Sequence, residues 1–154
     1  MDVAQTKLSV LLCSLFLLSG RAVRAQSAQD SRTSPADEEV FAMLKEFYTG
    51  YILGFTDISP EGRKREDSIL RKYCEPALLR KIDKKTRSGE LDWDPFLDAQ
   101  DMDTTCIKTL KFAKDAAKPD VYVVSYVYPG EKKTSMIHLN VARPATGYKI
   151  RDVW

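Results

Sequence analysis

Apolar residues recur at three- and four-residue steps between residues 40 and 55, which is the spacing of one face of a helix. The sequence Ser34-Pro35-Ala36-Asp37 just before them is a helix start signal, with Ser34 as the cap. The pattern therefore predicts a long core helix. Gly50 and Gly54 weaken it by about 1 kcal/mol each relative to alanine, and indicate either close backbone packing or fraying. The expected buried face is Val40, Leu44, Phe47, Tyr48, Tyr51, Ile52 and Phe55.

Two shorter helices follow. Ser59-Pro60-Glu61 opens a highly charged helix that ends near Tyr73, and Pro76 opens a third helix that stops at Ser88-Gly89. The bases Arg63-Lys64-Arg65 have acids beside them, which is typical of a solvated helix face and argues against an anion site. The positions expected to point inward are Ile69, Leu70 and Tyr73 on the second helix and Leu78, Leu79 and Ile82 on the third.

After Asp103 the apolar residues alternate, which is the period of a strand. Even spacing of Cys106, Leu110 and Phe112 predicts a first strand. Residues 120–128 are apolar on both faces, which predicts a central strand, and residues 136–142 and 148–154 predict two more, separated by Pro-Gly and Pro-x-x-Gly turns. Helices followed by consecutive strands indicate an α+β fold, with N-terminal helices packed on a curved antiparallel sheet of about four strands.

An acidic turn, residues 92–103, connects the helical half to the strand half. It contains five aspartates and no Lys or Arg. Asp94 is a good N-cap, Pro95 suits a first helical position, and the pair Phe96 and Leu97 supplies an apolar anchor, so we expect one short helical turn pinned into the core. Gln100 or Asp101 would satisfy neighbouring backbone donors.

Calcium is the alternative interpretation of this turn. Asp92, Asp94, Asp98 and Asp103 would fall at positions one, three, seven and twelve of a calcium-binding loop. The loop requires glycine at position six, where this chain has Leu97, and a bidentate Glu at position twelve, where it has Asp103. The apolar centre therefore argues for a structural turn, and we predict no metal and no cofactor.

Residues 1–25 are typical of a secretory signal peptide. A charged start at Lys7 precedes the apolar run Leu8–Leu18 and the small-x-small cleavage site Val23-Arg24-Ala25. The run is roughly half the 20 or so apolar residues of a membrane-spanning helix. We therefore expect export, a flexible leader over residues 26–33, a single domain over residues 34–154, and periplasmic or secreted localisation without a transmembrane segment.

Removal of the signal peptide changes the charge balance. The whole chain has 24 Lys and Arg against 22 Asp and Glu, a net charge of +2. Three of those bases and one of those acids lie in the signal peptide, so the mature chain is formally neutral. A nucleic-acid-binding domain usually carries a basic excess. The sequence therefore predicts no nucleic-acid partner.

The motif Asp-Pro-Phe-Leu-x-Ala-Gln-Asp at residues 94–101 resembles the hallmark of an uncharacterised family of small exported bacterial proteins, the domain of unknown function 3828 family. The resemblance implies the cystatin-like cone fold of nuclear transport factor 2, and it brings no catalytic residues because the family has no assigned activity. Tyr148 stands where the pattern more often has Trp. Further matching segments are Phe47-Tyr48-x-x-Tyr51, Tyr73-Cys74-x-Pro76-x-Leu78-Leu79 and Tyr148-Lys149-Ile150-x-Asp152-Val153.

Three functions are compatible with the sequence. We favour a non-catalytic binding module for a small ligand or a periplasmic protein; the alternatives are an inhibitor or immunity protein and a pocket enzyme of isomerase or dehydratase type. An enzyme would use acids, bases and donors among Asp98, Asp101, Tyr126, His138 and Asp152. A binding pocket would use Tyr48, Tyr51, Asp98, Asp101, Tyr126 and His138.

The cysteines add one structural prediction. Cys74 and Cys106 are the two cysteines that remain after signal cleavage. Disulfides form between such thiols in the oxidising environment outside the cytoplasm. We therefore expect a Cys74–Cys106 disulfide, with two separate buried thiols as the alternative.

Overall fold

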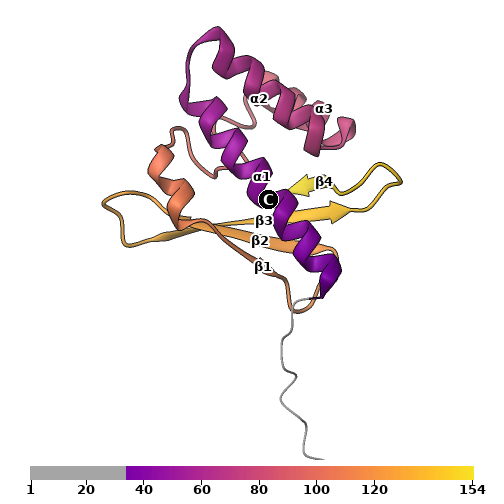
Figure 1. Ribbon diagram of the computed structural model, residues 1–154. Coiled ribbons are helices and arrows are strands. Elements are labelled where there is room, and N and C mark those ends of the chain that lie inside the picture. Colours follow the sequence, from indigo (N-terminus) through magenta and orange to yellow (C-terminus); the bar gives the residue numbers. More distant parts are fainter. Residues whose placement is uncertain (1–33) are drawn as a thin grey trace, which may run out of the picture. The chain divides into compact units, whose positions relative to one another are not determined.

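Three helices lie on an open, antiparallel four-stranded sheet in the computed structural model, which describes residues 34–154 (Figure 1). The predicted signal peptide (residues 1–25) and leader (26–33) lie outside the described residues. Within residues 34–154, none of the helices has both the length and the apolar character needed to cross a bilayer. The elements are α1 (Pro35–Thr56), α2 (Pro60–Tyr73), α3 (Pro76–Ser88), the 3₁₀ helix η1 (Thr104–Thr109), β1 (Lys111–Lys114), β2 (Val121–Val127), β3 (Thr134–Ala142) and β4 (Lys149–Val153).

Helix α1 begins as its sequence predicts, because the Ser34 hydroxyl accepts a hydrogen bond from the Asp37 amide at 3.1 Å. Its apolar face forms the centre of the core. The helix packs closely on α2 at Gly54, where an added Cβ would lie 2.7 Å from the Glu66 amide nitrogen. Of the two explanations for the glycines, close packing is therefore the one that the structure supports.

Helices α2 and α3 also start and stop at the predicted signals. Each has a proline in its first turn, and Gly89 ends α3 with a left-handed φ of 75°. Their inward faces are less buried than expected. Tyr73 and Leu78 are fully buried, whereas four predicted inward positions are only partly covered: Ile69, Leu70, Leu79 and Ile82.

The sheet has the order β1-β2-β3-β4, and every neighbouring pair is antiparallel, which confirms the predicted α+β fold class. The central strands β2 and β3 direct alternate side chains into the core beneath the helices. A register shift interrupts the β3–β4 ladder between Asn140 and Val141. The core residues of these strands are Tyr122, Val124, Tyr126, Ile137, Leu139 and Val141.

The predicted first strand is wrong in its first half. Residues 104–109 form η1, because the Asp103 carboxylate accepts a hydrogen bond from the Thr105 amide at 2.7 Å and starts a helical turn. Cys106 lies in this turn and is buried. Strand β1 begins only at Lys111, so of Cys106, Leu110 and Phe112 only Phe112 lies in a strand.

The predicted disulfide is not formed, and Cys74 and Cys106 are separate, buried free thiols. Cys74 ends α2 and forms a backbone bridge to Ile150 of β4, whereas Cys106 lies in η1, which packs on α1 and β2. Strand β3 lies between β4 and β2, so the two thiols occupy different parts of the core. Burial raises the pKa of Cys74 to about 12, which makes it an apolar filler and a poor nucleophile.

Candidate functional site

The acidic turn is anchored by Asp94, but no helix follows it. One carboxylate oxygen of Asp94 accepts hydrogen bonds from the amides of Phe96 at 2.9 Å and Leu97 at 3.0 Å, as a cap would. The chain then reverses at Asp98, which has a left-handed φ of 49°, and the Asp94 amide donates to the Ala99 carbonyl at 2.9 Å. The expected helical turn is therefore a tight closed loop, since the left-handed residue ends it after one turn.

The same carboxylate attaches the loop to α1. The Tyr51 hydroxyl donates to the second oxygen of Asp94. Burial raises the pKa of Asp94, while the hydrogen bonds from Tyr51, Phe96 and Leu97 oppose that rise. The Phe96 ring packs edge-on against Phe47 and Tyr51, with ring centroids 5.3 Å and 5.5 Å away. The prediction that Phe96 and Leu97 anchor the turn in the core is correct, and the Tyr51–Asp94 hydrogen bond attaches the loop to α1.

We expect Asp94→Ala to lower the free energy of unfolding by about 1–2 kcal/mol, because two amides and the buried Tyr51 hydroxyl lose their acceptor. Asp94→Asn keeps an oxygen for the amides and removes a partly buried charge, so it should stay within about 1 kcal/mol of wild type. Urea unfolding at pH 7 measures both. Equal losses in the two variants would contradict the assignment of Asp94 as a hydrogen-bond acceptor for the loop.

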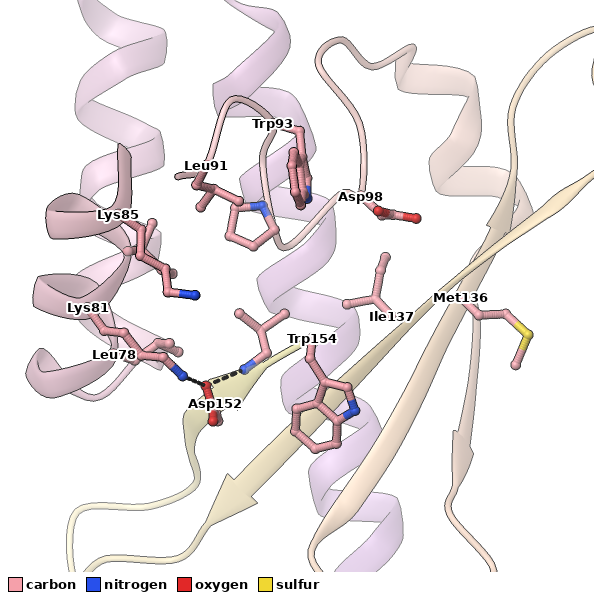
Figure 2. Close-up of a pocket in the computed structure, with 13 residues that line it drawn as sticks. Leu78, Lys81, Lys85, Leu91, Trp93, Asp98, Met136, Ile137, Asp152 and Trp154 are labelled. Atoms are coloured by element: carbon pink, nitrogen blue, oxygen red, sulfur yellow. Dashed lines mark hydrogen bonds and ion pairs between the residues drawn. The ribbon is translucent and has the colours of Figure 1, made fainter. Parts of the chain in front are cut away.

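The anchored loop forms one wall of a hollow of about 400 Å³ between α3 and the adjoining ends of β3 and β4 (Figure 2). Three large apolar residues among those that line it are exposed: Trp93 by 46%, Met136 by 57% and Trp154 by 53%. We call these three residues the Trp surface. Leu78, Ile82, Leu91, Pro95, Ile137 and Val153 complete the apolar lining.

Charged side chains frame the hollow on the α3 side. Lys81 of α3 forms an ion pair with Asp152 of β4, with 2.7 Å between Nζ and Oδ1 (Figure 2). Lys85 lies one turn further along the same helix and makes no ion pair with any residue in the described part of the chain. Lys81 and Lys85 are the two bases that line the hollow, and Asp98 and Asp152 are its two acids.

The predicted pocket residues are only partly brought together. Asp98, Asp101 and Tyr126 line a second hollow of about 400 Å³, with Tyr128, Glu131, Lys133 and Ser135. Asp98 lines the first hollow as well. Within residues 34–154, no cluster of three His, Cys, Asp or Glu side chains is arranged to hold a metal ion. The Gln100 side-chain amide donates a hydrogen bond to the Asp92 carbonyl at 3.5 Å, so it satisfies a backbone acceptor where a backbone donor was predicted.

The remaining candidates lie elsewhere. Tyr48 is fully buried in the core, and its hydroxyl has no hydrogen-bond partner among the described residues. His138 alternates with the core residues Ile137 and Leu139, so it faces the opposite side of the sheet, where it stacks on Trp154 with 5.9 Å between ring centroids. His138 lines neither of the two hollows, although Trp154 lines the first.

The Trp surface was not predicted from the sequence. Trp93 directly precedes the anchored loop and Trp154 directly follows β4, so neither lies within the apolar periods that mark buried faces. The available signal was the residue type itself, because tryptophan outside a core period is typical of interfaces.

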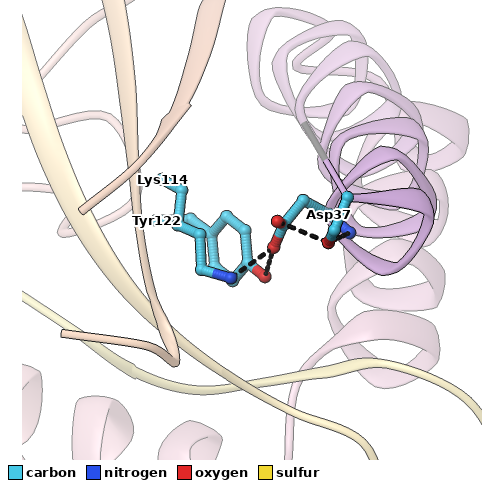
Figure 3. Close-up of polar contacts among 4 residues, drawn as sticks. Asp37, Lys114 and Tyr122 are labelled. Atoms are coloured by element: carbon cyan, nitrogen blue, oxygen red, sulfur yellow. Dashed lines mark hydrogen bonds and ion pairs between the residues drawn. The ribbon is translucent and has the colours of Figure 1, made fainter. Parts of the chain in front are cut away.

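A buried ionic cluster also escaped prediction. Asp37 on α1 accepts hydrogen bonds from the Lys114 ammonium at 2.6 Å and the Tyr122 hydroxyl at 2.7 Å, and so joins α1 to β1 and β2 (Figure 3). The Lys114 ammonium and the Ser34 hydroxyl hold the pKa of Asp37 well below its usual range. All of its oxygens are engaged within the protein, so this cluster is structural.

No protein-family model matches this chain, and no curated protein matches it. Solved structures do share its fold. A protein of unknown function from Bacteroides thetaiotaomicron is 27% identical, with a TM-score of 0.68 over 76% of this chain and 89% of that chain.

A chain of the native type VI effector–immunity complex Tae3–Tai3 from Ralstonia pickettii is 18% identical, with a TM-score of 0.55 over 79% of this chain and 94% of that chain. The selenomethionine form of the same complex gives a TM-score of 0.51 at 18% identity, over 73% of this chain and 91% of that chain. At this identity the likeness shows the fold alone.

Proposed function

We propose that this chain is an exported, non-catalytic binding domain that recognises a protein partner through the Trp surface, and that it acts as an inhibitor or immunity protein. The observation that carries the proposal is the exposure of Trp93, Met136 and Trp154 around one hollow. Tryptophan and methionine are enriched at protein interfaces, where tryptophan in particular supplies much of the binding energy. Three such side chains left in solvent around one cavity favour a protein partner.

The arrangement of polar groups favours binding over catalysis. Asp94 is the most buried carboxylate of the acidic turn, and both of its oxygens already accept hydrogen bonds, from the Tyr51 hydroxyl and from two loop amides. Asp152 is paired with Lys81, and His138 stacks on Trp154 but does not itself line the hollow. A proton-transfer enzyme needs an acid or base directed into its cavity with a hydrogen-bonding partner within reach. The hollow beside the Trp surface is instead walled mainly by apolar groups.

Two further observations support the compartment and the partner class. Residues 1–25 have the pattern of a signal peptide, and the motif at residues 94–101 resembles that of an exported family. One fold neighbour comes from a complex between an effector and its immunity protein, in which the two proteins bind each other. A small exported domain that blocks a toxic partner is consistent with all of these.

The test is a comparison of single substitutions in affinity capture from periplasmic extracts of the source cells. We expect Trp154→Ala to lower the captured partner at least tenfold relative to wild type, because an interface tryptophan commonly contributes about 2 kcal/mol or more. Ile58→Ala is the matched control: this side chain is 87% exposed and does not line the hollow, so the partner should be retained. Quantitative mass spectrometry measures the yield.

Co-production tests the inhibitory role. The captured partner, exported alone, should slow growth, and co-export of the wild-type chain should restore it, whereas Trp154→Ala should not. Partner capture that survives Trp154→Ala and Trp93→Ala would rule out the Trp surface. Capture that depends on Trp154 from a partner that is harmless when exported would leave a binding domain and rule out the immunity role.

A further inference from the structure

A third hollow, of about 520 Å³, lies at the junction of α2 and α3, where residues of the turn between β3 and β4 complete its lining. It shares no lining residue with the hollow beside the Trp surface. Its charge also differs, because three bases and one acid line it, whereas two of each line the hollow beside the Trp surface. The bases are Arg71, Arg80 and Lys149, and the acid is Glu75.

Two of the three bases have no acid beside them. Arg80 forms no ion pair with any residue in the described part of the chain. The Lys149 ammonium donates a hydrogen bond to the Lys72 carbonyl, a neutral group that leaves its charge uncompensated. Only Arg71 is paired, with 2.8 Å between its Nε and Oδ2 of Asp67. The third hollow is therefore positive, which favours an anion as its occupant.

Helix α3 contributes backbone donors to the same place. Glu75 holds the N-cap position, but its side chain makes no capping hydrogen bond and instead pairs with Arg151 at 3.3 Å. Pro76 has no N–H, so the first amides of the helix are those of Ala77 and Leu78, and neither has an acceptor in the part of the chain that the structure describes. Free amides at the start of a helix attract anions, because the positive end of the helix dipole lies there.

The Cys74 thiol is a further donor in this lining. Cys74 is only 1% exposed, and its sulfur forms no hydrogen bond with another described residue. The raised pKa keeps the thiol protonated at neutral pH, so it presents an S–H group and adds no negative charge. Buried polar groups normally have a hydrogen-bond partner, and here the protein supplies none.

Backbone contacts hold these donors in place. The Glu75 amide donates to the Ile150 carbonyl at 2.9 Å, and Cys74 forms a parallel bridge with the same residue of β4. Lys149, the neighbouring residue on β4, is tied to the last turn of α2 through the Lys72 carbonyl. The end of α2 and the start of α3 are thus fixed to β4, so the donors are arranged before any ligand binds.

We infer that the third hollow binds a phosphate group at the start of α3. The Arg80 guanidinium and the Lys149 ammonium would supply the positive charge, and the Ala77 amide would donate to a phosphate oxygen. A phosphate ester carries three acceptor oxygens and a charge of about −1.5 to −2 at pH 7, so it can use more of these donors than a carboxylate can. The inference does not depend on the proposed function, because the two hollows share no residue.

The test is an NMR titration of the isotope-labelled protein with inorganic phosphate at constant ionic strength. We expect the Ala77 and Leu78 amide resonances to shift and to saturate at low millimolar phosphate, whereas acetate should give no saturable shift. Glycerol 3-phosphate distinguishes the two sources of the group. Binding as tight as that of inorganic phosphate, or tighter, indicates a phosphate ester, and weaker binding indicates free phosphate.

Charge substitutions identify the side chains. Arg80→Gln and Lys149→Gln should each weaken phosphate binding by about fivefold or more, because each removes a charged donor. Lys84→Gln is the matched control: it removes the same charge from an exposed position of α3 that does not line the third hollow, so the affinity should change by less than about twofold. Thermal unfolding checks that each variant folds, and Arg80 has no ion pair to lose.

A second pair of variants tests the helix amides. Glu75→Ser places at the N-cap a hydroxyl that accepts from the first amides and so competes with the phosphate group. Glu75→Gln removes the same charge and the same pairing with Arg151, but glutamine is a poor cap. We expect phosphate to bind the serine variant about threefold or more weakly than the glutamine variant.

Two results would overturn the inference. One is the absence of a saturable shift at Ala77, or a shift that acetate reproduces, because the amides would then not contact a bound phosphate group. The other is equal affinity of Arg80→Gln and Lys84→Gln, which would show that phosphate responds only to the net charge of the protein. Both results leave partner capture through Trp154 untouched, so the proposed function stands or falls separately.

Discussion

Phe96→Ala should lower the free energy of unfolding by about 3–5 kcal/mol, the range for loss of a buried aromatic side chain. The Phe96 ring is only 2% exposed and lies against the rings of Phe47 and Tyr51. The loop on either side is held by Asp94 and by the hydrogen bond from Tyr126 to the Leu97 carbonyl, so it cannot collapse freely into the space. Urea unfolding followed by circular dichroism measures the change.

Phe96→Leu is the matched control. Leucine keeps most of the apolar volume, so its cost should stay below about 1.5 kcal/mol. If alanine cost no more than leucine, the ring would not be a packing anchor, and the loop would be held by the Asp94 hydrogen bonds alone.

Asp37→Asn should be the next most costly change, at about 2–3 kcal/mol at pH 7. The carboxylate receives hydrogen bonds from the Lys114 ammonium, the buried Tyr122 hydroxyl and the Ser34 hydroxyl (Figure 3). An amide cannot accept at both of its ends, so one or more of these donors loses a charged acceptor. Glu38→Gln, at the exposed neighbouring position, should change the free energy of unfolding by less than about 0.5 kcal/mol.

The cost of Asp37→Asn should depend on pH in a defined direction. Lys114 and Ser34 lower the pKa of Asp37 in the folded state, whereas the pKa of an aspartate in an unfolded chain is about 3.9. Below that value the unfolded chain binds the proton more readily than the folded chain, so the stabilisation by Asp37 is complete above about pH 5 and is lost as pH falls through the folded pKa. The difference between wild type and variant should therefore shrink between about pH 5 and pH 2. A difference that stays constant over this range would show that the charge of Asp37 contributes nothing.

Local signals in the sequence were sufficient for the helices and for most strands. Ser-Pro starts at residues 34 and 59 and the stop at Gly89 act within a few residues, so the bounds of α1, α2 and α3 follow from them. Alternation located β2, β3 and β4 in the same way. The same reasoning failed at residues 104–109, where the cap at Asp103 outweighed an even apolar spacing that only suggested a strand.

The candidate site was less predictable, because its parts come from distant segments. The sequence identified the acidic turn and its anchor residues, but not that Tyr51, 43 positions earlier, donates to Asp94. It proposed a cysteine pair from compartment and number alone, and the fold places those thiols in different regions of the core. It grouped His138 with Tyr126, whereas strand register turns the His138 side chain away from the core face that carries Tyr126.

By itself, then, the sequence determined the elements, their order, the α+β class and the apolar anchor of the acidic turn, because caps, prolines and periodicity act on neighbouring residues. Tertiary structure alone decided which tryptophans stay exposed and where the hollow forms. These features depend on how a loop held to α1 lies beside α3 and the ends of β3 and β4. No local pattern encodes such relations, since each one joins residues far apart in the chain.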